Sequence, residues 1–375
     1  MSGLALRLIL AFLPDLKVDT YGWLVWADRL ASFGPASFYS ESIWTHYTPG
    51  YLYILWLQGF IRQLFQIPDP SFYYFLKVPA IICEVILGYL SYQIISKHSR
   101  QLALWASAFV MFNPVLIFDS SVWGQVDSVL TLPMLLAVYL LDRGKYVSSA
   151  VSLAIAFLVK PQAIAIFPVF GLYFLKNFSV KNIILSTFYF LLSTLLLSWP
   201  FFPNNPVLGL VDMLSRMSAD YPFNSVNSFN LWGVFGLWIK DLTTFTSLSY
   251  QLWGVILFIT FWLLTSLFYL KRKLSLYPLS TLACLFFFFL PTRVHERYLY
   301  PGLVFLIVTA FIAKSKELII LMTALTIVNF LNLLYVYYLY SQNSYLLNST
   351  AVQSLSILSV ILFLLLSIVL FLKND

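Results

Sequence analysis

Apolar residues fill this chain in long runs, and short polar segments separate the runs. About 20 consecutive apolar residues let a helix cross a bilayer, and many of the runs approach that length. We therefore predict an all-α polytopic membrane protein, a bundle of about 11–12 transmembrane or partial helices forming one integral-membrane domain over residues 1–375. The predicted spans are 4–13, 72–95, 102–122, 128–141, 147–159, 162–175, 183–199, 250–270, 275–290, 301–313, 318–340 and 351–372.

Several of the middle spans, such as 147–159 and 162–175, are too short to cross a hydrocarbon core of roughly 30 Å alone. Partial helices of this kind are tolerated where they line a cavity enclosed by protein. No small-residue cleavage site follows the first run, 4–13, so it does not resemble a signal peptide. It is either a short first helix or the end of one whose start lies upstream.

The composition excludes a soluble protein, because 61% of the 375 residues are hydrophobic, only 10% are charged, and the mean hydropathy is +0.85. In a soluble chain, the net charge of +7 would suggest a nucleic-acid partner. Here the bias of Lys and Arg toward cytoplasmic loops explains it, and no nucleic acid is expected. Cys83 and Cys284 lie inside apolar spans without a CxxC pattern and are expected to be buried small side chains.

The charges also predict an orientation. If the spans alternate in direction, most Lys and Arg fall in loops on one side, which the positive-inside rule assigns to the cytoplasm. These residues are Lys97, Arg100, Arg143, Lys145, Lys176, Lys181, Lys271, Arg272, Lys273, Lys314, Lys316 and Lys373. Most acidic residues fall on the opposite side. We predict a site on the exoplasmic face of a membrane, by preference a bacterial plasma membrane.

Two long loops are predicted on that exoplasmic face. The first, 14–71, contains a helix-like stretch at Asp19–Phe33, which Gly34-Pro35 would end, and an interfacial one at Tyr51–Phe65. The second, 200–249, holds an aromatic run, 221–232, that includes Asn224, Asn227 and Asn230. Aromatic and amide side chains suit sugar binding, and they suit a plain interfacial loop almost as well.

The densest polar cluster in an apolar setting is Arg293-Val294-His295-Glu296-Arg297-Tyr298. Charged groups at bilayer depth cost several kcal/mol, so this segment is expected to line a polar cavity or to lie at the interface. Two arginines beside a histidine favour an anion, with phosphate as the natural ligand. Glu296 could serve to hold Arg293 or Arg297 in place.

Asp19 stands at the start of the first loop helix and has two interpretations. It could cap that helix, or it could act as a general base that takes a proton from an acceptor hydroxyl. Asp15 is the nearest competitor for the role of base, and Asp28 is a weaker one.

A second polar segment, Trp123-Gly124-Gln125-Val126-Asp127-Ser128, interrupts two apolar spans. Gln125 and Asp127 could hydrogen-bond a substrate sugar, or they could cap the next helix, with Asp127 or Ser128 near the N-cap. Trp123 could stack on a sugar ring or belong to the interfacial aromatic belt.

Lys160-Pro161-Gln162 is unusual, because Lys160 would lie at the exoplasmic end of a short span. Lys160 could snorkel to the interface or contact a phosphate. Glu84, inside a span, is either functional or paired with a neighbouring helix. The three His residues are scattered and match no metal-ligand spacing, so neither a metal nor another cofactor is expected.

Together these motifs resemble bacterial mannosyltransferases related to the enzyme that adds the second mannose of glycosylphosphatidylinositol anchors, within the GT-C glycosyltransferases. The first-loop order of Asp19, Trp26, Gly34-Pro35 and Phe38-Tyr39 is also similar to that family. One departure is His46-Tyr47-Thr48-Pro49-Gly50, where relatives tend to read Asp-Tyr-Pro-Pro-Gly. At that position this chain therefore has no acidic side chain.

The resemblance implies a GT-C-like bundle and an inverting transferase. It would move a sugar, mannose by analogy, from a polyprenyl-phosphate donor to a lipid or glycan acceptor, among membrane lipids. Asp19 would be the general base. The implied substrate-binding residues are Trp123, Gln125, Asp127, Lys160, Gln162, Arg293, His295, Glu296, Arg297 and Tyr298. The alternatives are a transporter or flippase for a lipid-linked sugar or another anion, and a scaffold without chemistry.

Overall fold

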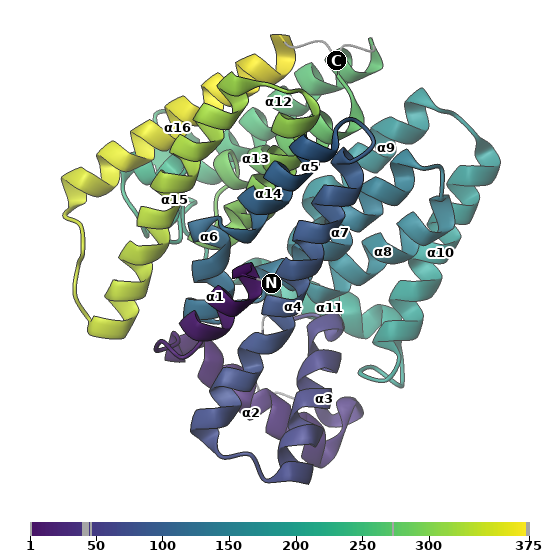
Figure 1. Ribbon diagram of the computed structural model, residues 1–375, viewed down its shortest axis with the longest axis vertical. Coiled ribbons are helices and arrows are strands. Elements are labelled where there is room, and N and C mark those ends of the chain that lie inside the picture. The colour runs from purple at the N-terminus through teal and green to yellow at the C-terminus, as the bar shows by residue number, and fades with distance from the viewer. Residues whose placement is uncertain (1, 40–44, 46, 272–273, 373–375) are drawn as a thin grey trace. The chain divides into compact units, whose positions relative to one another are not determined.

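The computed structural model describes residues 2–39, 45, 47–271 and 274–372 (Figure 1). Helices make up most of this described part. The α-helices are α1 (Ser2–Leu10), α2 (Lys17–Phe33), α3 (Pro49–Phe65), α4 (Asp69–Ile95), α5 (Arg100–Met111), α6 (Pro114–Ile117), α7 (Asp127–Asp142), α8 (Tyr146–Val159), α9 (Phe167–Lys176), α10 (Val180–Ser198), α11 (Pro206–Ala219), α12 (Tyr250–Leu270), α13 (Leu276–Phe289), α14 (Tyr300–Ile312), α15 (Lys316–Gln342) and α16 (Ser349–Leu372). Two short antiparallel strands, β1 (Thr244–Phe245) and β2 (Leu248–Ser249), form a hairpin.

The predicted all-α polytopic architecture is confirmed. Among the described residues, five helices are long and apolar enough to cross a membrane: α4, α10, α12, α15 and α16. A sixth span is possible if α5 and the following segment Pro114–Trp123, which are bent by 41°, count as one broken span. α8, the segment Pro161–Lys176 and α13 are apolar but shorter, as expected for partial helices.

The first-loop helices also form where the hydrophobic pattern places them. α2 ends at Phe33, and the N–H of Gly34 closes the last turn on the carbonyl of Leu30. α3 begins at Pro49, and proline suits a first helical position because it lacks an N–H to leave unpaired. α2 and α3 pack closely at Gly59, where a Cβ atom would lie 2.1 Å from the carbonyl oxygen of Ala27.

One helix of the second loop was not predicted. α11 starts at Pro206, and the Asn205 side chain caps it by accepting the N–H of Leu208 at 2.9 Å. Asn-Pro before an apolar run is the signal that would have located this helix. Its buried face, Leu210 and Met213, packs with Leu158 of α8 in a small hydrophobic cluster.

The chain divides into two compact units. The first comprises Met1–Leu87, Asp119–Ile164 and Ser179–Asp220, and the second comprises Gly88–Phe118, Ala165–Phe178 and Tyr221–Asp375. In the first unit α7 and α8 pack against each other, and in the second α15 and α16 run side by side (Figure 1). The predicted exoplasmic loops 14–71 and 200–249, and a single domain over the whole chain, stay predictions.

Candidate active site

Asp19 lies in the first turn of α2, half-buried, and accepts a hydrogen bond from Trp123 Nε1 at 2.8 Å. The N-cap of α2 is Leu16, so the interpretation of Asp19 as the capping residue is wrong, although its charge still favours the helix dipole. The Leu16 N–H donates to the Trp123 carbonyl at 3.1 Å, which joins the start of α2 to the same residue. Trp123 therefore fixes Asp19 through two hydrogen bonds, one to the Asp19 carboxylate and one to the backbone of Leu16 just before α2.

The competing carboxylates are held differently. Asp15 is buried and accepts a hydrogen bond from the Thr20 hydroxyl. Its Oδ1 also forms an ion pair with Lys17 Nζ at 2.9 Å. Asp28 lies 3.2 Å from Arg62, and burial raises its pKa more than that arginine lowers it. Asp19 combines partial exposure with a fixed orientation, which is the geometry a general base needs.

The Trp123–Ser128 segment connects Asp19 to Lys160, because Trp123 bonds Asp19 and Asp127 bonds Lys160. Asp127 and Lys160 form an ion pair at 2.9 Å, with side chains only 2% and 4% exposed. Lys160 is therefore not a snorkelling lysine. Gln125 Oε1 accepts from Lys160 Nζ and from the Tyr47 hydroxyl, each at 3.4 Å.

The geometry fits only one of the two simple roles of this segment. Asp127 is the first residue of α7 and follows the N-cap Val126, so it lies near the N-cap as predicted, although no side chain caps that helix. Trp123 is 1% exposed, which is too buried for an interfacial belt residue. Gln125 Nε2 and Gln162 Oε1 are buried without a hydrogen-bond partner among the described residues, so both amides retain capacity for a ligand.

We expect Gly124→Ala to lower the free energy of unfolding by about 1–3 kcal/mol, because Gly124 has φ of 92° and its Cβ would lie 3.1 Å from Thr20 Cγ2. Thermal unfolding in detergent, followed by tryptophan fluorescence, measures this. Gly171→Ala is the matched control, since Gly171 is inside α9 and, apart from its chain neighbours and the backbone of its own helix, no described atom lies within 4 Å of the position that an added Cβ would take. An equal loss in both variants would contradict the prediction.

Two buried basic residues of this unit were not predicted. Lys77 Nζ donates to the carbonyls of Ala11 and Leu13, at 2.9 and 3.0 Å, and so fastens the link between α1 and α2. Arg7 of α1 pairs with Glu84, which also accepts the Ser120 hydroxyl at 2.8 Å. Glu84 is thus paired with a neighbouring helix, one of its two predicted roles. A charged residue inside an apolar run was the available signal in each case.

In the second unit, the predicted arginines are both paired with buried carboxylates. Arg293 Nε donates to Asp241 Oδ2 at 2.6 Å, and Arg297 Nη1 donates to Glu296 Oε1 at 2.9 Å. Glu296 therefore holds Arg297, as expected, whereas Arg293 depends on Asp241, which the sequence did not single out. His295 lies half-buried beside the Tyr298 ring, with ring centres 5.3 Å apart.

The backbone of this segment is strained. Arg293 has φ of 66°, and Tyr221, Asn227 and Trp238 also have positive φ. Such conformations cost about 1–3 kcal/mol each in non-glycine residues and cluster at functional sites. The Arg293 N–H donates to the carbonyl of Phe223 at 2.9 Å, so the 221–240 loop supports the arginine segment.

Two of the three asparagines that the sequence marked in that loop, Asn224 and Asn230, bond the backbone with their amides. Asn224 Oδ1 accepts the N–H groups of Ser225 and Ile239, at 2.7 and 3.0 Å. Asn230 Oδ1 accepts those of Trp232 and Gly233, each at 3.1 Å. These two amides are structural, which disfavours a sugar-binding role for them.

Each unit thus holds one of the two predicted groups of site residues. Asp19, Trp123, Gln125, Asp127, Lys160 and Gln162 lie in the first unit, and Arg293, His295, Glu296, Arg297 and Tyr298 lie in the second. No group of three or more metal-ligating side chains occurs in the part of the chain that the structure describes. Whether the two groups share one cavity stays a prediction.

The apolar helices of the described residues define a multi-pass membrane protein, and buried ion pairs such as Lys160–Asp127 lie within it. The chain belongs to glycosyltransferase family 87, whose family model matches residues 44–291, about two thirds of its length. The match includes Trp123 and Lys160 but neither Asp19 nor Arg293–Tyr298. No curated protein was found to match the chain.

Proposed function

We propose that this glycosyltransferase takes its sugar from a polyprenyl-phosphate donor and transfers it to a lipid or glycan acceptor on the exoplasmic face. Family membership supports the reaction class. The observation that carries the proposal is the Asp19 carboxylate, which is partly exposed and oriented by Trp123 Nε1 at 2.8 Å. Mannose as the sugar and a GT-C relationship are part of the same proposal and rest on the motif resemblance.

In the proposed reaction, Asp19 accepts the proton of the acceptor hydroxyl as the oxygen attacks the anomeric carbon. The bond between that carbon and the donor phosphate breaks, and its electron pair leaves with the lipid phosphate. A single displacement inverts the anomeric centre. Phosphate is a good leaving group, so no second acid is needed, in contrast to a glycosidase.

Arg293 and Arg297 are proposed to stabilise the charge that builds on the departing phosphate, with His295 beside them. An arginine has five N–H donors, so one nitrogen can bind a carboxylate while others bind an anion. Asp241 and Glu296 would fix the direction of each guanidinium before the donor arrives. Gln125, Asp127, Lys160, Gln162 and Tyr298 would bind or brace the substrates.

The decisive experiment incubates the purified full-length protein, in lipid nanodiscs, with a panel of polyprenyl-phosphate sugars and with total lipid and glycan extracts as acceptors. Transfer from at least one donor, with inversion at the anomeric carbon, is expected. Transfer only from nucleotide sugars, or movement of a lipid-linked sugar across the membrane without transfer, would overturn the proposal.

We expect Arg297→Lys to raise the KM for the lipid-linked donor about tenfold, because lysine keeps the charge but loses the planar two-pronged donor geometry that matches phosphate. Arg297 is mostly buried and bonded to Glu296, so its position is well defined. Initial rates at varied donor concentration measure the effect. Arg216→Lys, at the exposed Arg216–Asp212 pair of α11, should leave this KM unchanged.

A further inference from the structure

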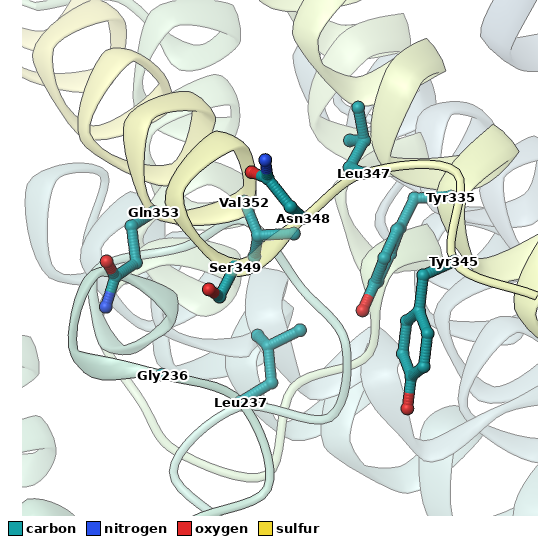
Figure 2. Close-up of a pocket in the computed structure, with 9 residues that line it drawn as sticks. All are labelled: Gly236, Leu237, Tyr335, Tyr345, Leu347, Asn348, Ser349, Val352 and Gln353. Atoms are coloured by element: carbon teal, nitrogen blue, oxygen red, sulfur yellow. The ribbon is translucent and has the colours of Figure 1, made fainter.

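A pocket of about 470 Å³ lies in the second unit, between the loop at Gly236-Leu237 and the adjoining ends of α15 and α16 (Figure 2). In this view Tyr335 and Tyr345 stand on one side, Gln353 stands on the other, and Leu237 and Ser349 lie between them. This volume is within the range of small-molecule binding sites.

The chemistry of the walls favours a neutral sugar. The nine lining residues, all within the described ranges, carry no charge, so they offer nothing to balance a phosphate. They do supply aromatic faces at Tyr335 and Tyr345 and amides at Asn348 and Gln353. Aromatic rings pack against the apolar faces of sugars, and amides hydrogen-bond their hydroxyls; a few placed polar groups in an apolar wall are typical of ligand sites.

The polar groups have capacity for such a ligand. Asn348 Oδ1 accepts the N–H of Ala351 and caps α16, which orients the side chain and leaves its amide nitrogen as a donor. The Gln353 side chain makes no hydrogen bond with the residues that the structure describes. Tyr335 is only 5% exposed and forms a fixed wall, whereas Tyr345 is 75% exposed at the rim.

The loop and the helix that line the pocket also hydrogen-bond the backbone of the Arg293–Tyr298 segment in the same unit. On the loop side, the carbonyl of Gly236 accepts from Asn224 Nδ2 at 2.7 Å, within the 221–240 loop that bonds the Arg293 backbone. On the helix side, Asn329 of α15 donates to the Glu296 carbonyl at 3.1 Å, less than two turns before Tyr335. The loop and the helix that line the pocket are therefore each hydrogen-bonded to the backbone of the Arg293–Tyr298 segment.

We propose that this pocket binds a neutral sugar unit of the acceptor, apart from the arginines assigned to the donor phosphate. The inference rests on the proposed function, since it names the acceptor as a carbohydrate. It assigns Tyr345 and Gln353 to acceptor recognition and gives them no part in the chemical step.

Kinetics test the assignment. With the full-length protein in nanodiscs, Tyr345→Ala and Gln353→Ala are each expected to raise the acceptor KM about three- to tenfold, with less than a twofold change in kcat and in donor KM. The matched controls are Tyr338→Ala and Gln342→Ala, near the end of α15 and outside the pocket lining, which should leave the acceptor KM unchanged. An unchanged acceptor KM in both pocket variants, with active wild type, would overturn the pocket assignment and leave the transferase function intact.

Direct binding tests it without turnover. Saturation-transfer NMR would use methyl and octyl glycosides of mannose, glucose and galactose, with geranylgeraniol as an apolar probe. A signal from at least one sugar pair, reduced by Tyr345→Ala, supports the pocket even if no donor is ever found. An octyl glycoside binding much more tightly than its methyl partner identifies a glycolipid source, and equal binding identifies a free glycan. Geranylgeraniol alone showing the Tyr345-dependent signal would overturn the proposal.

Discussion

Asp19→Asn is expected to lower the rate of sugar transfer by about 10²–10⁴-fold, the usual contribution of general base catalysis. Asparagine has the same shape, and its Oδ1 can still accept the Trp123 Nε1 hydrogen bond, so the start of α2 should keep its structure. What the variant loses is the capacity to accept a proton. Initial rates with saturating donor, normalised to the folded protein recovered from the membrane, measure the effect.

Two further variants separate the base from its neighbours. Asp15→Asn should lower the rate by less than about tenfold, because the Asp15 carboxylate is occupied by Thr20 and Lys17. Asp212→Asn, at an exposed ion pair of α11, is the control for expression and stability. Full activity of Asp19→Asn would remove Asp19 from the mechanism, and a complete loss only in Asp15→Asn would transfer the role to Asp15.

The second large effect is expected at the Lys160–Asp127 ion pair. Lys160→Met should lower the free energy of unfolding by about 3–5 kcal/mol, because it leaves the Asp127 carboxylate buried without its cation. Both side chains are nearly inaccessible, so water cannot replace the lost partner. The loss is measured as a fall in the thermal midpoint, followed by tryptophan fluorescence.

The double variant Lys160→Met/Asp127→Asn distinguishes structure from function. Removing both charges should restore most of the stability, since no unpaired charge remains. If Lys160 also binds a substrate, transfer stays low in the stable double variant. Restored transfer would make the pair purely structural. Arg216→Met, which breaks an exposed ion pair, should lower the free energy of unfolding by less than about 1 kcal/mol. A thermal midpoint of Lys160→Met equal to that of the wild type would contradict the prediction.

Much of the helical architecture could be predicted because it depends on consecutive residues. The predicted span 250–270 coincides with α12, and Tyr51–Phe65 falls inside α3. Apolar runs of this length have few alternatives to a helix in a bilayer, because every backbone N–H and C=O must be paired within the segment. α11 was missed because it is short and amphipathic, so its hydrophobic signal is weaker than that of a span.

The candidate site could be predicted only in part. The sequence marked Arg293, Arg297, Asp127 and Lys160 as unusual, because charges in apolar surroundings are costly and rarely accidental. It could not say which charges pair. Arg293 bonds Asp241, a residue 52 positions away that has no unusual local context.

By itself, then, the sequence determined that this is a helical membrane protein, where most of its helices run, and that several of its polar residues require an explanation. The hydropathy of a span is a sum over consecutive residues, so it can be calculated from the sequence without a structure. Only the tertiary structure decided that Trp123 orients Asp19, that Lys160 neutralises Asp127, and that two tyrosines and two amides border one pocket. Those contacts join residues on different helices or loops, and they exist only once packing has brought their backbones within reach.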